Sequence, residues 1–269
     1  MNDALDENAS KVAAVTLGFW IIKIAATTLG ETAGDWVTMS LGLGYLVGTA
    51  IFAAVMIVGV TLQIRAKQFY PVIYWTVIIA TTTLGTTMAD FADRSLGVGY
   101  PGGVSILLTL LIASIAIWYW SEGSVSVNTV TTARTEAFYW TTILFSQTLG
   151  TALGDWMAGS DRGGLGLGYE TGALVFSAAI AIVAGAYFWT SNSRTALFWA
   201  AFVLTRPLGA TLGDFLDKPL SSGGLALNRL YASLILIAFM VVCTWVFPQR
   251  AGRHSGGPAT LPAKTKSAS

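Results

Sequence analysis

Four aspartates recur at matching positions of a short repeated motif, and these side chains have the clearest potential for chemistry in the sequence. The copies of the motif are TTLGETAGDW at 27–36, TTLGTTMADF at 82–91, QTLGTALGDW at 147–156 and RPLGATLGDF at 206–215. Each copy has an aspartate five residues after its motif glycine, which gives Asp35, Asp90, Asp155 and Asp214. Carboxylates are hard oxygen ligands, so four of them together favour a hard cation such as Mg²⁺, Mn²⁺, Ca²⁺ or Na⁺.

Hydroxyl groups and one further carboxylate accompany the aspartates. Residues seven apart lie nearly in line on an α-helix, and in three copies a threonine stands seven residues before the aspartate. Another polar residue stands four before it. The predicted ion-binding residues are therefore the four aspartates, which would also be the metal ligands, together with Glu31, Thr28, Thr83, Thr86, Thr148 and Thr151. The fourth copy departs from this pattern, with Pro207 and Ala210 in place of hydroxyl or carboxyl residues.

Two cations interrupt the apolar segments and are candidates for charge compensation. Arg206 lies eight residues before Asp214, and the hypothesis is that it pairs with Glu31 or with a motif aspartate. Lys23 lies three residues beyond Trp20. Because a lysine near a helix end can extend its ammonium to the membrane interface, Lys23 is expected to reach that interface.

A structural role for the aspartates is the competing interpretation. Each motif has small residues four apart, as at Gly30 and Gly34, and this spacing lets helices approach closely in lipid. The aspartates would then accept hydrogen bonds from loop amides or cap the next helix, and the protein would be a scaffold or a sensor. However, acidic groups at membrane depth are costly and usually face a bundle interior or a watery cavity, which favours ion binding.

The composition predicts that the motifs lie in a membrane protein. Of 269 residues, 54% are hydrophobic and 11% are charged, whereas soluble domains carry about 25% charged residues. A helix needs about 20 residues to cross a bilayer. Eight such helices are expected at 12–34, 44–64, 70–90, 101–120, 136–156, 168–190, 195–215 and 226–247. They would form one transmembrane domain over 1–247, followed by a disordered cytoplasmic tail at 248–269.

The motif belongs to a longer repeat, because a tryptophan precedes each motif glycine by ten residues. Four repeats are predicted at about 12–64, 70–120, 136–190 and 195–247. The expected fold is an all-α polytopic bundle of four parallel helix hairpins around an axis along the membrane normal. Repeats two and four add a second acid and a base after the motif, Asp93-Arg94 and Asp217-Lys218, which indicates approximate twofold symmetry.

Charge places both termini in the cytoplasm by the positive-inside rule. On the side of the termini lie Lys11, Arg65, Lys67, Arg134, Arg194, Arg250, Arg253, Lys264 and Lys266, against only Arg94, Arg162, Lys218 and Arg229 on the other side. The net charge of +1 gives no basis for binding nucleic acid. With one cysteine, Cys243, and one histidine, His254, the chain is not expected to be an enzyme or to hold any cofactor beyond a divalent or monovalent cation.

The repeat, with its TLG-x-x-x-G-D core, resembles a bacterial inner-membrane family of uncharacterised membrane-anchored proteins built from an internal repeat of unknown function. The resemblance covers about residues 12–247 and implies an architecture and a location but no reaction. The residues themselves favour a transporter of a small hard cation, with the aspartates in a ring around a cavity at the outer side. Its expected partners are the lipid bilayer and the cation, and a homo-oligomer is a further possibility.

Overall fold

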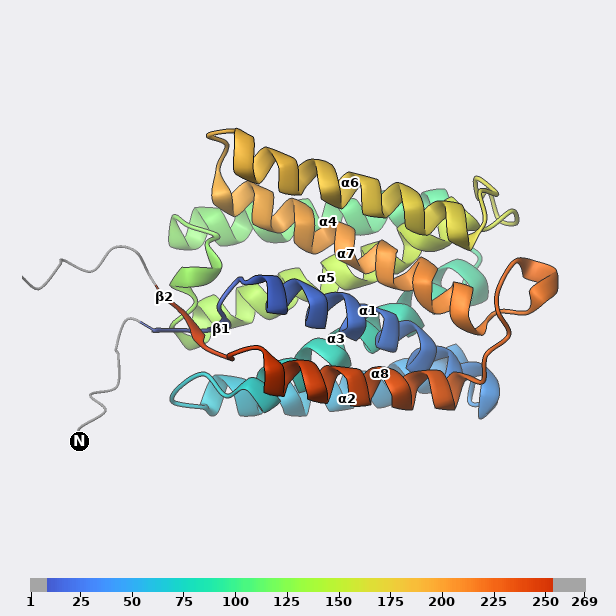
Figure 1. Ribbon diagram of the computed structural model, residues 1–269, viewed down its shortest axis with the longest axis horizontal. Coiled ribbons are helices and arrows are strands. Elements are labelled where there is room, and N and C mark those ends of the chain that lie inside the picture. Colours follow the sequence, from blue (N-terminus) through green and yellow to red (C-terminus); the bar gives the residue numbers. More distant parts are fainter. Residues whose placement is uncertain (1–8, 254–269) are drawn as a thin grey trace, which may run out of the picture.

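Eight long helices make up most of the computed structural model, which describes residues 9–253 (Figure 1). They are α1 (Leu17–Asp35), α2 (Gly44–Arg65), α3 (Pro71–Asp90), α4 (Tyr100–Glu122), α5 (Ala133–Ala158), α6 (Tyr169–Trp189), α7 (Arg194–Asp217) and α8 (Arg229–Val246). All of them except α1 and α5 are long and apolar enough to cross a membrane. The chain is thus an all-α protein with the character of a polytopic membrane protein.

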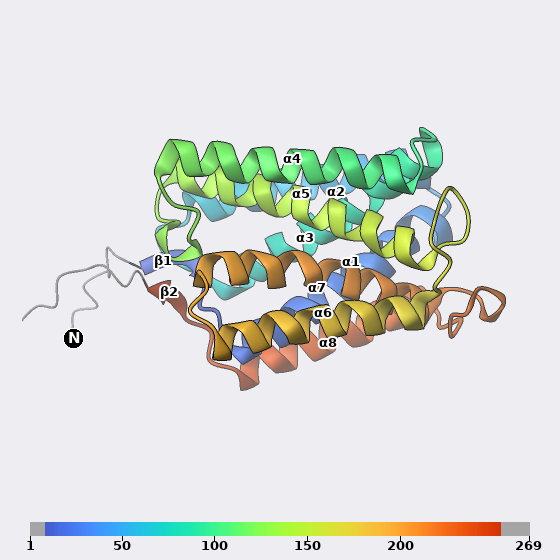
Figure 2. The same cartoon turned by 90° about the horizontal axis from the view of Figure 1, so that it is seen from above.

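The odd-numbered helices, which carry the motifs, form a closed central ring in the order α1, α3, α5, α7. The even-numbered helices lie outside this ring (Figures 1 and 2). Each packs chiefly on the odd-numbered helix of the following repeat: α2 on α3, α4 on α5, α6 on α7, and α8 on α1. The two helices of one repeat therefore make few contacts with each other, unlike those of a closed hairpin.

The motif glycines allow the central helices to touch. Each glycine packs against the residue that lies three before the motif glycine of a neighbouring helix in the ring. The contacts are Gly30 with Thr82, Gly85 with Gln147, Gly150 with Arg206 and Gly209 with Thr27. The same contact runs around the whole ring, as close packing through small residues in lipid predicts.

Gly85→Ala is expected to lower the free energy of unfolding by about 1–3 kcal/mol. A Cβ at Gly85 would lie 2.9 Å from the Gln147 carbonyl carbon and from the Thr148 amide nitrogen. These are backbone atoms, so no side-chain rotation relieves the clash. Unfolding in mild detergent measures the loss. The control is Gly185→Ala, whose methyl would meet only the exposed Trp189 ring, and an equal loss there would contradict the importance of the ring contact.

Two short strands pair with each other at one end of the bundle, here called the terminal end (Figure 1). Strand β1 (Ala9–Ala13) pairs antiparallel with β2 (Ala251–Arg253). The predicted helix start at residue 12 is wrong, because Thr16 caps α1 by accepting a hydrogen bond from the Phe19 amide. The predicted disordered tail is also wrong at its start, since β2 is ordered, and residues 254–269 lie outside the described part. The opposite end, with the loops that follow the motifs, is called the loop end.

The exposed faces of the outer helices are apolar, as contact with lipid requires. At the terminal end Trp120, Trp189 and Trp245 are 89%, 85% and 89% exposed, in the last turns of α4, α6 and α8. These tryptophans form the aromatic belt typical of a membrane interface. The tryptophans ten before the motif glycines have another role. Three of them, Trp75, Trp140 and Trp199, are buried with Tyr74, Tyr139 and Phe202 in an aromatic cluster that fills the centre of this end.

Candidate functional site

The four motif aspartates lie near the loop-end termini of the central helices. Asp35 and Asp90 are the last residues of α1 and α3, while Asp155 and Asp214 lie in the last turns of α5 and α7. None of the four is more than 4% exposed. They are therefore enclosed by protein, whereas the sequence predicted a cavity open to the outside.

The first pair of aspartates is joined by Arg94, the base that follows the second motif. Its Nε atom lies 2.6 Å from Asp90 Oδ1, and its Nη2 atom lies 3.4 Å from Asp155 Oδ2. Arg94 thus links the end of α3 to the end of α5. The cation that pairs with both carboxylates is thus the Arg94 side chain of the protein itself.

The second pair is joined by Lys218, the base that follows the fourth motif. Its Nζ atom lies 3.1 Å from Asp214 Oδ1 and donates a hydrogen bond to Asp35 Oδ2. Arg229 extends this group, at 3.8 Å from Asp35 and 2.9 Å from Asp217. Burial alone would lower the pKa of Lys218, but Asp214 and Asp35 raise it well above its ordinary value, so the ammonium is charged.

The two pairs repeat one arrangement. In both, the base lies four residues after an aspartate of its own repeat and reaches the aspartate of the next repeat around the ring, as the predicted twofold pattern implies. In the sequence Arg94 and Lys218 were noted for the twofold pattern and for the charge on one side of the membrane, and the predicted site did not include them. The i to i+4 spacing between acid and base was the signal that could have identified them.

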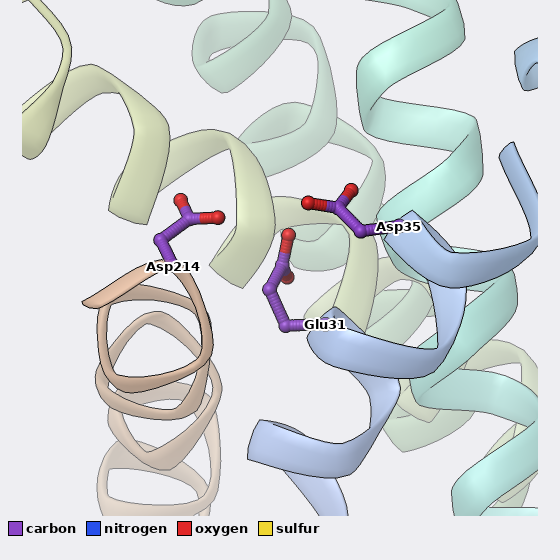
Figure 3. Close-up of side chains that lie close together, drawn as sticks. All are labelled: Glu31, Asp35 and Asp214. Carbon is purple, nitrogen blue, oxygen red and sulfur yellow. The ribbon is translucent and has the colours of Figure 1, made fainter. Parts of the chain in front are cut away.

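A third carboxylate distinguishes the Lys218 pair from the Arg94 pair. Glu31, Asp35 and Asp214 each offer an oxygen, and these oxygens lie within 4.8 Å of one another. Figure 3 shows the three carboxylates turned toward one another, two from α1 and one from α7. Asp35 Oδ1 is buried and lacks a hydrogen-bond partner among residues 9–253. We call Glu31, Asp35 and Asp214 the acidic centre, and its oxygens are suitable ligands for a hard cation.

Arg206 closes the axis of the ring beneath the acidic centre. Its Nη2 atom lies 2.9 Å from Glu31 Oε2, which confirms the hypothesis that the two pair. The same atom donates to the hydroxyls of Thr86 and Thr151, each at 2.5 Å. Glu31, Thr86 and Thr151 all follow a motif glycine directly, so one guanidinium joins the equivalent position of three repeats.

Lys23 lies deeper in the ring, toward the terminal end, and its side chain is 0% exposed. Its Nζ atom is 3.4 Å from Gln147 Oε1, 3.5 Å from Thr205 Oγ1 and 4.1 Å from the centre of the Phe202 ring. The expectation that Lys23 reaches the membrane interface is therefore wrong. Lys23 also forms no ion pair with any acid in the described chain.

The predicted threonines divide into two groups. Thr86 and Thr151 converge on Arg206. Thr28, Thr83 and Thr148 instead donate to carbonyls four residues earlier in their own helices, at 3.0, 2.8 and 2.9 Å. The structure therefore brings Glu31 and two aspartates into one group with Arg206 close by, and it places the second group of threonines outside this contact network.

Comparison with known proteins identifies the repeat. A family model described as Repeat of Unknown Function (DUF347) matches the chain four times, at residues 18–69, 73–124, 138–193 and 197–251. Each match covers an odd-numbered helix of the ring and the outer helix that follows it. No curated protein and no solved structure matches the chain.

Proposed function

The chain belongs to the family defined by this Repeat of Unknown Function, and from that premise we propose that it is a membrane transporter for a small hard cation. The observation that carries the proposal is the acidic centre, where three buried carboxylate oxygens lie within 4.8 Å of one another. Carboxylates so close together in a low-dielectric interior repel one another unless positive charge lies between them. The acidic centre is the proposed ion-binding site.

Charge balance at the acidic centre favours a divalent ion. Glu31 is paired with Arg206, so Asp35, Asp214 and Asp217 are balanced only by Lys218 and Arg229. With all three aspartates ionised, this group keeps one negative charge in excess. If a divalent ion replaces the Lys218 ammonium, the three aspartates, Arg229 and the ion together become neutral. Mg²⁺, Mn²⁺ and Ca²⁺ fit both the charge and the oxygen ligands.

Ion entry requires Lys218 to leave its two aspartates. Lys218 is the first residue after α7, so its side chain can move with the loop without unwinding a membrane helix. Toward the terminal end the axis is blocked by Arg206 and by the aromatic cluster. Passage of the ion through this barrier requires a conformational change, which favours a transporter over an open channel.

The proposed location is a bacterial inner membrane, with the terminal end in the cytoplasm and the acidic centre toward the outside. The support is the excess of basic residues on the side of the termini. In this orientation the ion reaches the acidic centre from the outer loops.

Ion-dependent thermal unfolding of the purified full-length protein tests the proposal. We expect Mn²⁺, Mg²⁺ or Ca²⁺ to stabilise the wild type by about 2.7 kcal/mol at a hundredfold excess over its Kd, and Asp35→Asn or Asp214→Asn to abolish the effect. The control is Asp161→Asn, because Asp161 is an exposed acid of the loop end that pairs with Arg162. Uptake of the stabilising ion into proteoliposomes then tests transport itself.

The second candidate function is a scaffold or sensor that does not transport. The observation in its favour is that each motif aspartate already has a base of the chain as its partner. In this case no ion stabilises the wild type, and Asp35→Asn and Asp214→Asn only lower its stability. That result would end the transporter proposal.

A further inference from the structure

A group of buried nitrogen donors with incomplete hydrogen bonding begins at Arg206 and continues on the side away from the acidic centre. The first member is Lys23, whose ammonium contacts only neutral oxygens at 3.4 and 3.5 Å and the face of the Phe202 ring. A buried cation normally requires an anionic partner, because removal from water penalises its charge heavily. None of the acids in residues 9–253 forms an ion pair with Lys23.

Two neighbours of Lys23 add further donors. Gln147 offers its Oε1 atom to Lys23, while its Nε2 amide group has no partner in the described structure. Arg206 uses Nη2 for three contacts, but its Nε group is likewise without a partner among residues 9–253. The aliphatic part of Arg206 lies against Gly150, one helical turn from Gln147, so these donors belong to adjacent turns of one interface.

The local charge indicates what is missing. When Lys23 is protonated, it and Arg206 bring two positive charges to this part of the axis, and Glu31 compensates one of them. Water could satisfy the free donors, but it could not neutralise the remaining charge. A monovalent anion does both.

We propose that Lys23, Gln147 and Arg206 form a binding site for one small monovalent anion of the halide or nitrate class. The ammonium, the amide N–H and the guanidinium Nε–H would donate to it, and the Phe202 ring would close the site on one side. The site is separate from the acidic centre, which lies beyond Arg206. It does not depend on the proposed cation transport.

Anion-dependent stability of the full-length protein in lipid nanodiscs tests this site. Sodium and ionic strength are held constant while gluconate, a much larger anion, is replaced by chloride, bromide or nitrate. We expect a saturable rise in Tm of roughly 5–10 °C at a hundredfold excess over Kd. Lys23→Met should abolish this rise, and Lys11→Met should retain it, because Lys11 pairs with Glu136 at the terminal end.

Broadening of the ³⁵Cl NMR signal by the wild-type protein provides a measurement that does not require a stable variant. We expect broadening that bromide or nitrate reverses and gluconate does not. If chloride gives no rise in Tm over gluconate and no competable broadening, the proposal is overturned, and Lys23 is a neutral amine. A rise in Tm that survives in Lys23→Met would also overturn it.

Discussion

Arg206→Met is expected to lower the free energy of unfolding by about 3–5 kcal/mol, because it leaves Glu31 as a buried carboxylate without its cation. The guanidinium lies 2.9 Å from Glu31 and 2.5 Å from the hydroxyls of Thr86 and Thr151, so the other three central helices lose a shared contact. Reversible unfolding in mixed micelles or bicelles measures the change.

The double variant Arg206→Met, Glu31→Gln separates charge from packing. The neutral glutamine side chain no longer needs a cation, so we expect the double variant to recover most of the loss. Lys67→Met is the control for removal of a lone exposed cation and should change stability by less than about 0.5 kcal/mol. A double variant as unstable as Arg206→Met would show that packing of the arginine, and not its charge, stabilises the ring.

Lys218→Met is expected to have opposite effects on stability and on ion affinity. Without a divalent ion it should lose about 3–5 kcal/mol, since Asp214 loses its cation and Asp35 keeps only the more distant Arg229. With Mn²⁺ or Mg²⁺ it should bind at least tenfold more tightly than wild type, a difference of about 1.4 kcal/mol, because the tethered competitor is gone. Unfolding in the absence of ion measures the loss of stability, and titration calorimetry measures the gain in affinity.

Arg94→Met is the matched control from the other half of the molecule. Arg94 joins Asp90 to Asp155 as Lys218 joins Asp214 to Asp35. However, α5 has Thr151 at the position where α1 has Glu31, so this half lacks the counterpart of Glu31. We expect a similar loss of stability and no gain in affinity. Equal gains in both variants would contradict the assignment of the ion site to the acidic centre.

The sequence predicted the repeat and the fold class because both depend on local patterns. Hydropathy over about 20 residues located the eight helices, and the recurring glycine and aspartate located the four units. The sequence did not predict which helices pack together. Helix α2 packs on α3 of the following repeat and not on α1 of its own repeat. That choice depends on the shapes of two helix surfaces, which a repeat period does not describe.

The candidate site was predicted in part. The pairing of Arg206 with Glu31 could be predicted because opposite charges in apolar helices stabilise each other when they pair. The position of Lys23 was missed, because snorkelling depends on whether a helix faces lipid, and α1 is enclosed by α3, α7 and α8. The ligand role predicted for Thr28 stays a prediction, and in the structure its hydroxyl donates to the Ile24 carbonyl four residues earlier.

Each outer helix packs on the central helix of the following repeat, and α8 packs on α1, which bears on the order in which the protein assembles. Helix α1 carries three charged residues, Lys23, Glu31 and Asp35, and is synthesised before the other seven helices described here. Two of the helices that enclose it, α7 and α8, are synthesised after the other six helices of residues 9–253. Until then Glu31 has no Arg206 and Asp35 has no Lys218. We therefore expect α1 to integrate stably only late in biogenesis, after α7 and its following loop have been made.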